Sequence, residues 1–473
     1  MNAHAACPPD LNFKAGLLWA LSAILSFHLA CGFVAGAFLV GVHLFSLLQL
    51  SRVGGRWPAI ALEWGTGLLI YGPQLGFFWA VFGPGAIALW LVLAFWLRLF
   101  VLLLRATRQR LGPGWAALAA PVLWTGLEYF RSELYYLRFS WIIPGYTFAW
   151  SPVLPVLKWI GMYGVGFVLM ALAAGVWILP RRHAVLTGGI LLAALAALTH
   201  MPLTAPARPD DTTKPLRVAG VQLEFPGEIE VLHALARVRR DQPDAALFVL
   251  SEYTFDGPVP DRVKNWCRTN QVHLVAGGKD FFAEDEFRNT VFVVAPSGEI
   301  VFKQAKAVPI QFFKDGARAT EQRVWESPWG RIGICICYDL SYTRVVDELV
   351  RRGAQLLLVP TMDMAEWGGP QHRLHARVAP VRAAEHALPV FRLASSGISQ
   401  WVDARGRVRA SAPFPGDGAI LTAELDLPAG GSRPLDRVLA PAASGLTALL
   451  ALGLTIQELL AFRARRRLAS GQA

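Results

Sequence analysis

Long apolar runs with few charges dominate the first 200 residues of the chain. The first run, residues 15–50, has no charged side chain and carries Gly32 and Gly36 near its middle, which predicts two membrane spans joined by a tight hairpin. It is longer than the apolar core of a signal peptide, which favours an anchor. Six more spans are predicted at residues 58–82, 83–104, 115–129, 153–179, 184–198 and 438–462. We therefore expect seven spans within residues 1–200 and one near the C-terminus.

Basic residues are concentrated between these runs. They form four clusters: Arg52 and Arg56; Arg105, Arg108 and Arg110; Arg181 and Arg182; and Arg463, Arg465, Arg466 and Arg467. A cytoplasmic N-terminus would place all four clusters on the cytoplasmic side, as the positive-inside rule requires. The region between the seventh and eighth spans then lies outside the cytoplasm, and residues 437–473 form a span and a basic cytoplasmic tail.

The hydrophobic pattern changes after residues 201–214, a Pro- and Thr-rich stretch that we expect to be a linker. From residue 215 to 436, short apolar strands alternate with amphipathic helices. Strands are predicted at 216–223, 245–252, 272–278, 289–295, 299–306, 330–337 and 354–360, and helices at 228–240, 260–270, 343–352 and 371–386. Apolar strands alternating with helices indicate an α/β layered domain with a buried sheet.

Composition supports a membrane protein. Hydrophobic residues make up 54% of the chain and charged residues 17%, below the quarter or so that is usual in soluble proteins. The net charge of +11 is explained by the basic loops between spans, so we expect no nucleic-acid partner. Five cysteines without a CxxC pair form neither a disulfide framework nor a zinc site. Cys335 and Cys337, two apart in a predicted strand, should point to the same face.

Three predicted strands each end on a residue with useful chemistry: Glu252, Lys306 and Cys337. Functional residues of layered α/β domains gather at strand ends. A carboxylate can take a thiol proton, an ammonium group can stabilise an oxyanion, and a thiolate can attack a carbonyl carbon. Together these groups predict acyl transfer through a thioester.

Each of these assignments has an alternative. Glu252 could be a helix cap or a surface acid, Lys303 competes with Lys306, and Cys335 competes with Cys337. We favour Lys306, and we favour Cys337 because Cys335 lies inside the apolar run. Several polar residues could also be imagined as a metal site: Asp363, Glu366, His372, His375 and Glu385. Helix packing and polarity of a substrate loop explain them more simply, so we expect neither a metal nor another cofactor.

Several motifs, in a shared order, resemble a known family. ICYD at residues 336–339 and the stretch 368–399 resemble the nucleophile and the following motifs of the nitrilase superfamily, which uses a Glu, Lys and Cys catalytic set. LWTGLEYFR, FSWIIPGY and IGMYGVGF in the first half are similar to segments of the bacterial apolipoprotein N-acyltransferases. The resemblance implies a multi-span helical membrane domain joined to a nitrilase-like αββα sandwich.

The resemblance also implies an activity and a location. Such an enzyme takes an acyl chain from a membrane phospholipid and passes it, through a thioester on Cys337, to a diacylglyceryl-modified apolipoprotein. Glu252 would act as base, while Lys306 and backbone N–H groups near Tyr338 would hold the oxyanion. Substrate-binding residues would include Tyr338, Asp339, Glu366 and Trp367. The enzyme would lie in the bacterial inner membrane with its catalytic domain on the periplasmic side.

The chain departs from the family pattern at three places. Ser251 stands where a proline usually precedes the catalytic Glu, and AVPIQFFKDG follows Lys306 where HLVPFGE is usual, so a second Glu is absent and Asp315 is the nearest acid. TMDMAEW replaces a TND sequence before the Trp. We interpret the chain as a divergent member. Two other functions stay open, a membrane-tethered amidase or hydrolase and an inactive scaffold.

Overall fold

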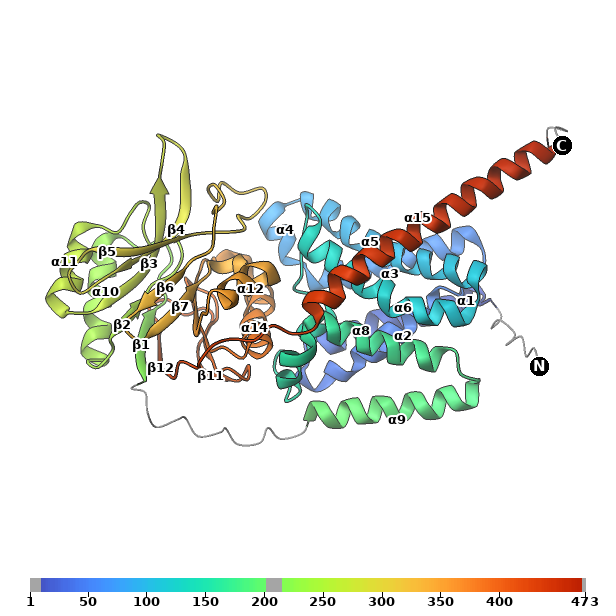
Figure 1. The fold of residues 1–473 in the computed structure, drawn as a ribbon, viewed down its shortest axis with the longest axis horizontal. Coiled ribbons are helices and arrows are strands. Elements are labelled where there is room, and N and C mark those ends of the chain that lie inside the picture. Colours follow the sequence, from blue (N-terminus) through green and yellow to red (C-terminus); the bar gives the residue numbers. More distant parts are fainter. Residues whose placement is uncertain (1–9, 201–214, 470–473) are drawn as a thin grey trace.

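A computed structural model describes residues 10–200 and 215–469 of the chain. Helices fill one end of the elongated molecule and an α/β domain fills the other (Figure 1). Cys7 and the predicted linker at residues 201–214 lie outside the described residues. The helical end contains α1 (Phe13–Gly32), η1 (Val34–Leu39), α2 (Val40–Leu50), α3 (Arg56–Gln74), α4 (Phe77–Phe82), α5 (Gly85–Leu111), α6 (Pro113–Tyr129), η2 (Phe130–Leu134), α7 (Pro144–Thr147), η3 (Leu154–Val156), α8 (Leu157–Trp177), α9 (Arg181–His200) and α15 (Asp436–Ala469).

Five helical segments of the described chain are long and apolar enough to cross a membrane: Phe13–Gly32, Gly85–Leu111, Leu154–Trp177, Arg181–Leu198 and Asp436–Arg466. The apolar segment Val34–Leu50 is shorter. Helices α3 and α6 pack among them, and the C-terminal α15 runs along α6 and α8 (Figure 1). The predicted count of eight crossings, and their sidedness, stay predictions.

The α/β end consists of two six-stranded sheets. Its strands are β1 (Leu216–Val221), β2 (Leu247–Val249), β3 (His273–Phe281), β4 (Phe287–Val294), β5 (Ile300–Ala305), β6 (Val324–Ser327), β7 (Gly330–Ile334), β8 (Leu356–Thr361), β9 (Val390–Ala394), β10 (Ser399–Val402), β11 (Val408–Ala412) and β12 (Ile420–Leu425). The orders are β12-β1-β2-β3-β4-β5 and β11-β10-β9-β8-β7-β6. In each sheet three parallel strands, β1-β2-β3 or β7-β8-β9, are flanked by antiparallel ones.

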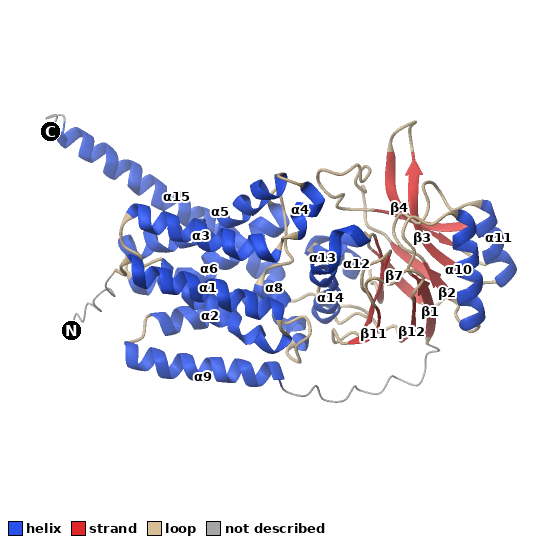
Figure 2. Ribbon diagram, turned by 180° about the vertical axis from the view of Figure 1, so that it is seen from behind, coloured by secondary structure: helices blue, strands red, loops and turns tan. Residues whose placement is uncertain are grey.

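Helices cover the outer faces of the two sheets and complete an αββα sandwich. Helices α10 (Glu228–Asp241) and α11 (Asp261–Asn270) lie on the side remote from the membrane domain (Figure 2). Helices α12 (Thr343–Arg351), α13 (Gly368–Ala376) and α14 (Val378–His386) lie between the second sheet and the helical end (Figure 2). The predicted fold class is therefore confirmed.

Two predicted elements differ from those in the structure: one helix is interrupted and one strand ends earlier. The helix predicted at 371–386 is two helices, because Pro380 cannot donate the backbone hydrogen bond of a helix interior and fits only in a first turn. The strand predicted to reach Cys337 stops at Ile334, and Cys337 begins the 3-10 helix η4 (Cys337–Ser341). The expectation that Cys335 and Cys337 share one face of a strand was therefore wrong.

Buried polar contacts join the two ends of the molecule. Helix α8 is broken at Gly161, whose φ of +71° suits glycine, and a Cβ there would collide with the Asp436 carboxylate. The break exposes two backbone N–H groups: Met162 donates to Glu385 Oε1 at 2.7 Å, and Tyr163 donates to Asp436 Oδ2 at 3.0 Å. Arg437 bridges both carboxylates. The α/β domain, α8 and α15 thus meet at one charged joint.

Candidate active site

Glu252, Lys306 and Asp315 form a buried ionic group at the ends of β2 and β5. Lys306 Nζ lies 2.8 Å from Glu252 Oε1 and 2.8 Å from Asp315 Oδ2. The Lys306 side chain is 1% exposed, so its ammonium group depends on these carboxylates for its polar contacts. Lys303 lies on the surface and pairs with Asp280, so it does not belong to this group.

Neighbouring donors fix the two carboxylates. Asn289 Nδ2, on β4, donates to Glu252 Oε1 at 2.5 Å and to Asp315 Oδ1 at 2.8 Å. Asp315 also accepts from the Tyr253 hydroxyl at 2.8 Å. The other oxygen of Glu252, Oε2, accepts from the backbone N–H of Met362 at 2.7 Å. Both carboxylates are therefore held in one orientation.

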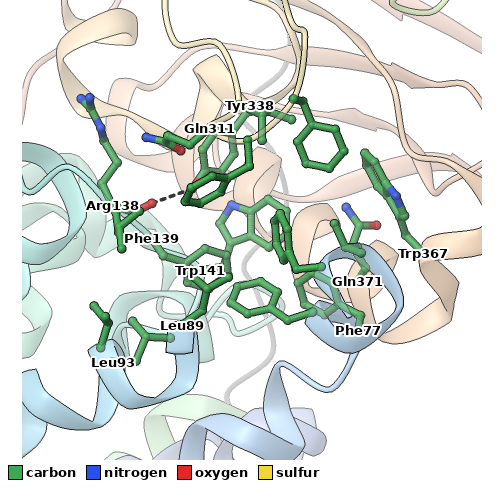
Figure 3. A pocket seen from close by; sticks show the side chains of 18 residues that line it. Phe77, Leu89, Leu93, Arg138, Phe139, Trp141, Gln311, Tyr338, Trp367 and Gln371 are labelled. Carbon is green, nitrogen blue, oxygen red and sulfur yellow. Dashed lines mark hydrogen bonds between the residues drawn. The ribbon is translucent and has the colours of Figure 1, made fainter. Parts of the chain in front are cut away.

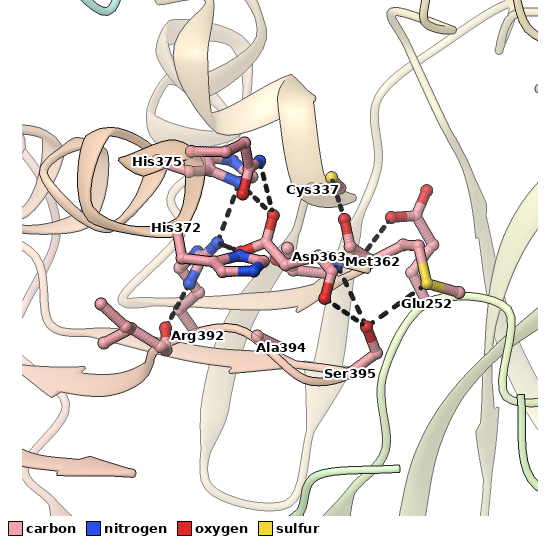
Figure 4. A network of polar contacts seen from close by, with 12 residues as sticks. Glu252, Cys337, Met362, Asp363, His372, His375, Arg392, Ala394 and Ser395 are labelled. Carbon is pink, nitrogen blue, oxygen red and sulfur yellow. Dashed lines mark hydrogen bonds and ion pairs between the residues drawn. The ribbon is translucent and has the colours of Figure 1, made fainter. Parts of the chain in front are cut away.

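Cys337 sits beside this group on a sharp turn. Its φ of +52° lies in the left-handed region, which is unfavourable for residues other than glycine. The surrounding structure must therefore hold the backbone of Cys337 in this conformation. Its Sγ donates to the Met362 carbonyl at 3.6 Å, while the N–H of Met362 binds Glu252 (Figure 4). One residue thus contacts both the thiol and the carboxylate.

Burial and charge set the protonation states of these groups. Burial raises the pKa of Cys337 well above its usual value, and the Glu252 charge adds to that rise. Burial also raises the pKa of Glu252, although Lys306 opposes the rise. Burial would lower the pKa of Lys306, but the charges of Asp315 and Glu252 raise it well above the usual value. The resting state therefore contains a thiol and an ammonium group, and attack by sulfur requires a base.

Asp339 ties the segment after Lys306 to the cysteine turn. Its oxygens accept three backbone N–H groups, from Val308 at 2.7 Å, Ala307 at 3.0 Å and Ile336 at 3.2 Å. Burial raises the pKa of Asp339 to about 6, against the effect of Lys306 and these hydrogen bonds. The carboxylate thus fixes the position of Lys306 relative to Cys337.

A second polar network holds the segment that follows β8. Asp363 Oδ2 lies 2.5 Å from Arg392 Nη2, and Oδ1 lies 2.7 Å from His375 Nδ1 (Figure 4). Burial would raise the pKa of Asp363, but its contacts with His375 and Arg392 hold it far below the usual value. His375 also stacks on Trp141, with ring centroids 4.6 Å apart. These contacts fix Met362, the residue before Asp363, and join it to the membrane domain.

An apolar cavity of about 120 Å³ lies next to the cysteine turn, between the two ends of the molecule (Figure 3). Its walls come from α4 and α5, from the segment after Lys306, and from Trp141, Tyr338, Trp367 and Gln371. Phe82 on α4 packs against Phe312 and Phe313 across the boundary, with ring centroids 6.0 and 5.8 Å apart. An acyl chain is the kind of group that such walls accommodate.

The structure brings together most, but not all, of the residues singled out in the sequence. Glu252, Lys306, Cys337 and Asp339 converge, and Tyr338 and Trp367 line the cavity. Glu366 is exposed and does not line it. Asn289, Met362 and Arg392 also belong to this region and were not predicted from the sequence. A polar Asn inside an apolar strand was a usable signal for the first; nothing local marked the other two.

Comparisons with known proteins found similar proteins for both ends of the molecule. Residues 15–175 match the apolipoprotein N-acyltransferase N-terminal domain, and residues 229–434 match the carbon-nitrogen hydrolase family. An apolipoprotein N-acyltransferase of Geobacter metallireducens is 26% identical, over 66% of this chain and 68% of its own. One of Azotobacter vinelandii is 28% identical, over 85% and 83%. The crystal structure of a carbon-nitrogen hydrolase from Helicobacter pylori G27 covers 45% of this chain and 89% of its own, with a TM-score of 0.40 and 18% identity.

The two-sheet sandwich and the hydrolase match define the class: a membrane protein whose α/β domain is a member of the nitrilase superfamily, an enzyme of the acyltransferase or hydrolase type. The match extends through the helical half as well. The chain belongs, as a divergent member, to the apolipoprotein N-acyltransferase family.

Proposed function

We propose that this chain is an apolipoprotein N-acyltransferase that moves an acyl chain from a membrane phospholipid, through a thioester on Cys337, to the N-terminal amine of a diacylglyceryl-modified cysteine. One observation carries the proposal. The Glu252–Lys306–Asp315 group and the Cys337 turn adjoin an apolar cavity that is built jointly by the catalytic and membrane domains. Lipid substrates explain why the two domains share this cavity.

In the first half-reaction, the Glu252 carboxylate takes the thiol proton of Cys337, and the thiolate attacks the ester carbonyl carbon of the phospholipid. Lys306 and the backbone N–H of Tyr338 stabilise the oxyanion. When the tetrahedral intermediate collapses, the C–O bond breaks and the leaving alkoxide takes the proton from Glu252. A lysophospholipid departs, and the acyl chain stays on sulfur as a thioester.

In the second half-reaction, the α-amine of the lipoprotein attacks the thioester carbonyl. Glu252 takes the amine proton, the C–S bond breaks, and the proton returns to the Cys337 sulfur. Asp315 contributes by holding the Lys306 ammonium group, which lies 2.8 Å from its Oδ2. Tyr338 and Trp367 form part of the wall that contacts the acyl chain.

Location follows from the charge pattern and the substrates. The four basic clusters favour a cytoplasmic N-terminus, which puts the α/β domain on the periplasmic side of the bacterial inner membrane. The phospholipid donor and the lipoprotein acceptor would then both reach the cavity from the outer leaflet. The bilayer itself is therefore a partner of the enzyme.

Replacement of Cys337 tests the proposal directly. The full chain, as wild type, Cys337→Ala and Cys335→Ala, is incubated with phospholipid and a diacylglyceryl lipopeptide, and the products are read by mass spectrometry. We expect an acyl adduct and N-acylated peptide with wild type and Cys335→Ala, and neither with Cys337→Ala. An adduct in Cys337→Ala would refute the nucleophile assignment, and free fatty acid as the main product would show a hydrolase.

A further inference from the structure

A second cavity, of about 440 Å³, lies at the end of the membrane domain remote from the α/β domain. It lies between the start of α3 and the second half of α5, and Arg56, Arg98 and Arg105 line it. Leu89, which lines the cavity beside the cysteine turn, precedes Arg105 by 16 residues, or about 24 Å of helix. The second cavity is therefore separate from the candidate active site.

Positive charge exceeds negative charge at this cavity. Arg105 Nη2 lies 2.5 Å from Glu63 Oε1, and Arg98 Nε lies 3.5 Å from Glu63 Oε2, so two guanidinium groups share one carboxylate. Asp10 also lines the cavity, and it pairs with Arg108 at 2.6 Å. Arg56 forms no ion pair within residues 10–200 and 215–469. Arg56, Arg98, Arg105 and Asp10 line the cavity, and Glu63 and Arg108 pair with these residues without lining it, so the group of four guanidiniums and two carboxylates carries a surplus of two positive charges.

The arginine side chains and the start of α3 leave hydrogen-bond donors at the cavity for an anionic ligand. Arg105 is held rigidly, because its Nε donates to the Ser51 carbonyl at 3.2 Å and its Nη2 to the Leu50 carbonyl at 3.2 Å. Arg98 approaches Glu63 at a distance too long for a hydrogen bond, so its guanidinium group retains donor capacity. Helix α3 begins at this cavity, after Gly55, without a side-chain cap on its first N–H groups.

The position of the cavity beside an apolar, membrane-crossing helix also favours an anionic ligand. Arg98 lies within the membrane-crossing helix Gly85–Leu111, where a charge without full compensation is costly and marks a site. Exposed Leu102 also lines the cavity and would contact lipid tails. Guanidinium groups bind phosphate oxygens in a bidentate manner, and basic pockets between membrane helices hold phospholipid headgroups.

We propose that the cavity bordered by Arg56, Arg98 and Arg105 binds a phosphate group. Two sources carry that chemistry: the headgroup of an anionic phospholipid, and free phosphate. Neither is the acyl donor of the reaction, because the cavity lies at the other end of α5. A bound phosphate would neutralise the surplus charge and hold α3 and α5 together.

The test uses the purified full chain in detergent with phosphatidylglycerol, phosphatidylethanolamine or inorganic phosphate added. Thermal unfolding and native mass spectrometry report binding to wild type, Arg56→Gln/Arg98→Gln and Arg56→Gln alone. Arg56 is exposed, so its single variant should fold normally. Arg181→Gln/Arg182→Gln is the matched control, because it removes the same charge at exposed positions outside the cavity.

We expect phosphatidylglycerol to be retained and to stabilise wild type and the control, with affinity about tenfold lower for each cavity arginine removed. Stabilisation by inorganic phosphate alone would also support the site and would identify free phosphate as its ligand. Equal retention of phosphatidylglycerol by wild type and Arg56→Gln/Arg98→Gln would overturn the proposal. An equal loss in the control would overturn it too, because binding would then depend on net charge alone.

Discussion

At the scale of single residues, Asn289 is the group whose removal reports most directly on the proposed base. Its amide donates to both Glu252 and Asp315, and such hydrogen bonds favour the charged form of a carboxylate. Burial already raises the pKa of Glu252 above its usual value. The acid limb of the pH–rate profile should therefore lie above the ordinary Glu range, with activity rising as Glu252 loses its proton.

We predict that Asn289→Ala moves this acid limb to higher pH, by about one to two pH units if the lost hydrogen bond is worth 1.5–3 kcal/mol. The rate of acyl-adduct formation on Cys337, measured from pH 5 to 9, checks the prediction. Gln304→Ala serves as control, since Gln304 is buried on the neighbouring strand and bonds only backbone groups. An unshifted limb in Asn289→Ala would exclude Glu252 as the titrating base.

Asp315 gives a second prediction at this scale. In Asp315→Asn, the Lys306 ammonium group loses one of its two carboxylates, so its position and charge are less well fixed. We expect adduct formation to slow by about tenfold to a hundredfold, the range of 1.4–3 kcal/mol. Asp315→Glu keeps the charge and should recover part of the rate. Equal losses in both variants would indicate that shape, rather than charge, matters at this position.

Candidate site residues could be predicted from the sequence where a polar residue follows an apolar strand. They could not be predicted where their role depends on contacts between distant parts of the chain. Glu252 and Lys306 stand directly after apolar runs, so the pattern alone marked them as candidates. Asp315 was noted only as the nearest acid after Lys306, because it lies in a segment without periodicity, and its contact with Tyr253 joins residues 62 apart in the sequence. Met362 acts through its backbone, which no side-chain pattern can reveal.

At the scale of elements, Arg382 on α14 holds the cysteine-bearing helix η4. Its Nε donates to the Leu340 carbonyl at 2.9 Å, its Nη2 donates to the Ser341 carbonyl at 2.6 Å, and its Nη1 lies 2.5 Å from Glu385 Oε2. Glu385 in turn accepts from Met162 of α8. The C-terminal part of η4 is thus fixed to the joint between the domains. The break before α14, which Pro380 marks in the sequence although one continuous helix was predicted, sets the direction of this helix.

We predict that Arg382→Met destabilises the fold by about 3–5 kcal/mol, because it leaves Glu385 buried with only part of its compensation. Arg382→Met/Glu385→Gln should be more stable than the single variant, since the buried charge is removed while an acceptor for Met162 remains. Thermal unfolding in detergent compares the two. A double variant less stable than Arg382→Met would show that the ion pair does not account for the loss.

At the scale of the whole molecule, the cavity between the domains separates a lipid-using transferase from a hydrolase that is merely tethered to the membrane. A tethered hydrolase would not need α4 and α5 as walls of its site. Here Phe77, Leu89 and Leu93 come from those helices, whereas Tyr338 and Trp367 come from the α/β domain (Figure 3). The dependence of the reaction on the length of the acyl chain should therefore reside in the membrane half.

We predict that Leu89→Trp, which places a larger side chain in the cavity, slows adduct formation with a long-chain phospholipid by tenfold or more, the effect of about 1.4 kcal/mol. It should leave the reaction with a short-chain ester almost unchanged, because the bulk lies in the acyl-chain cavity rather than at sulfur. Leu91→Trp is the matched control, since Leu91 lies on the same helix, is exposed and does not line the cavity. If both esters slowed equally in Leu89→Trp while Leu91→Trp kept the wild-type rates, the assignment of this cavity to the acyl chain would be contradicted.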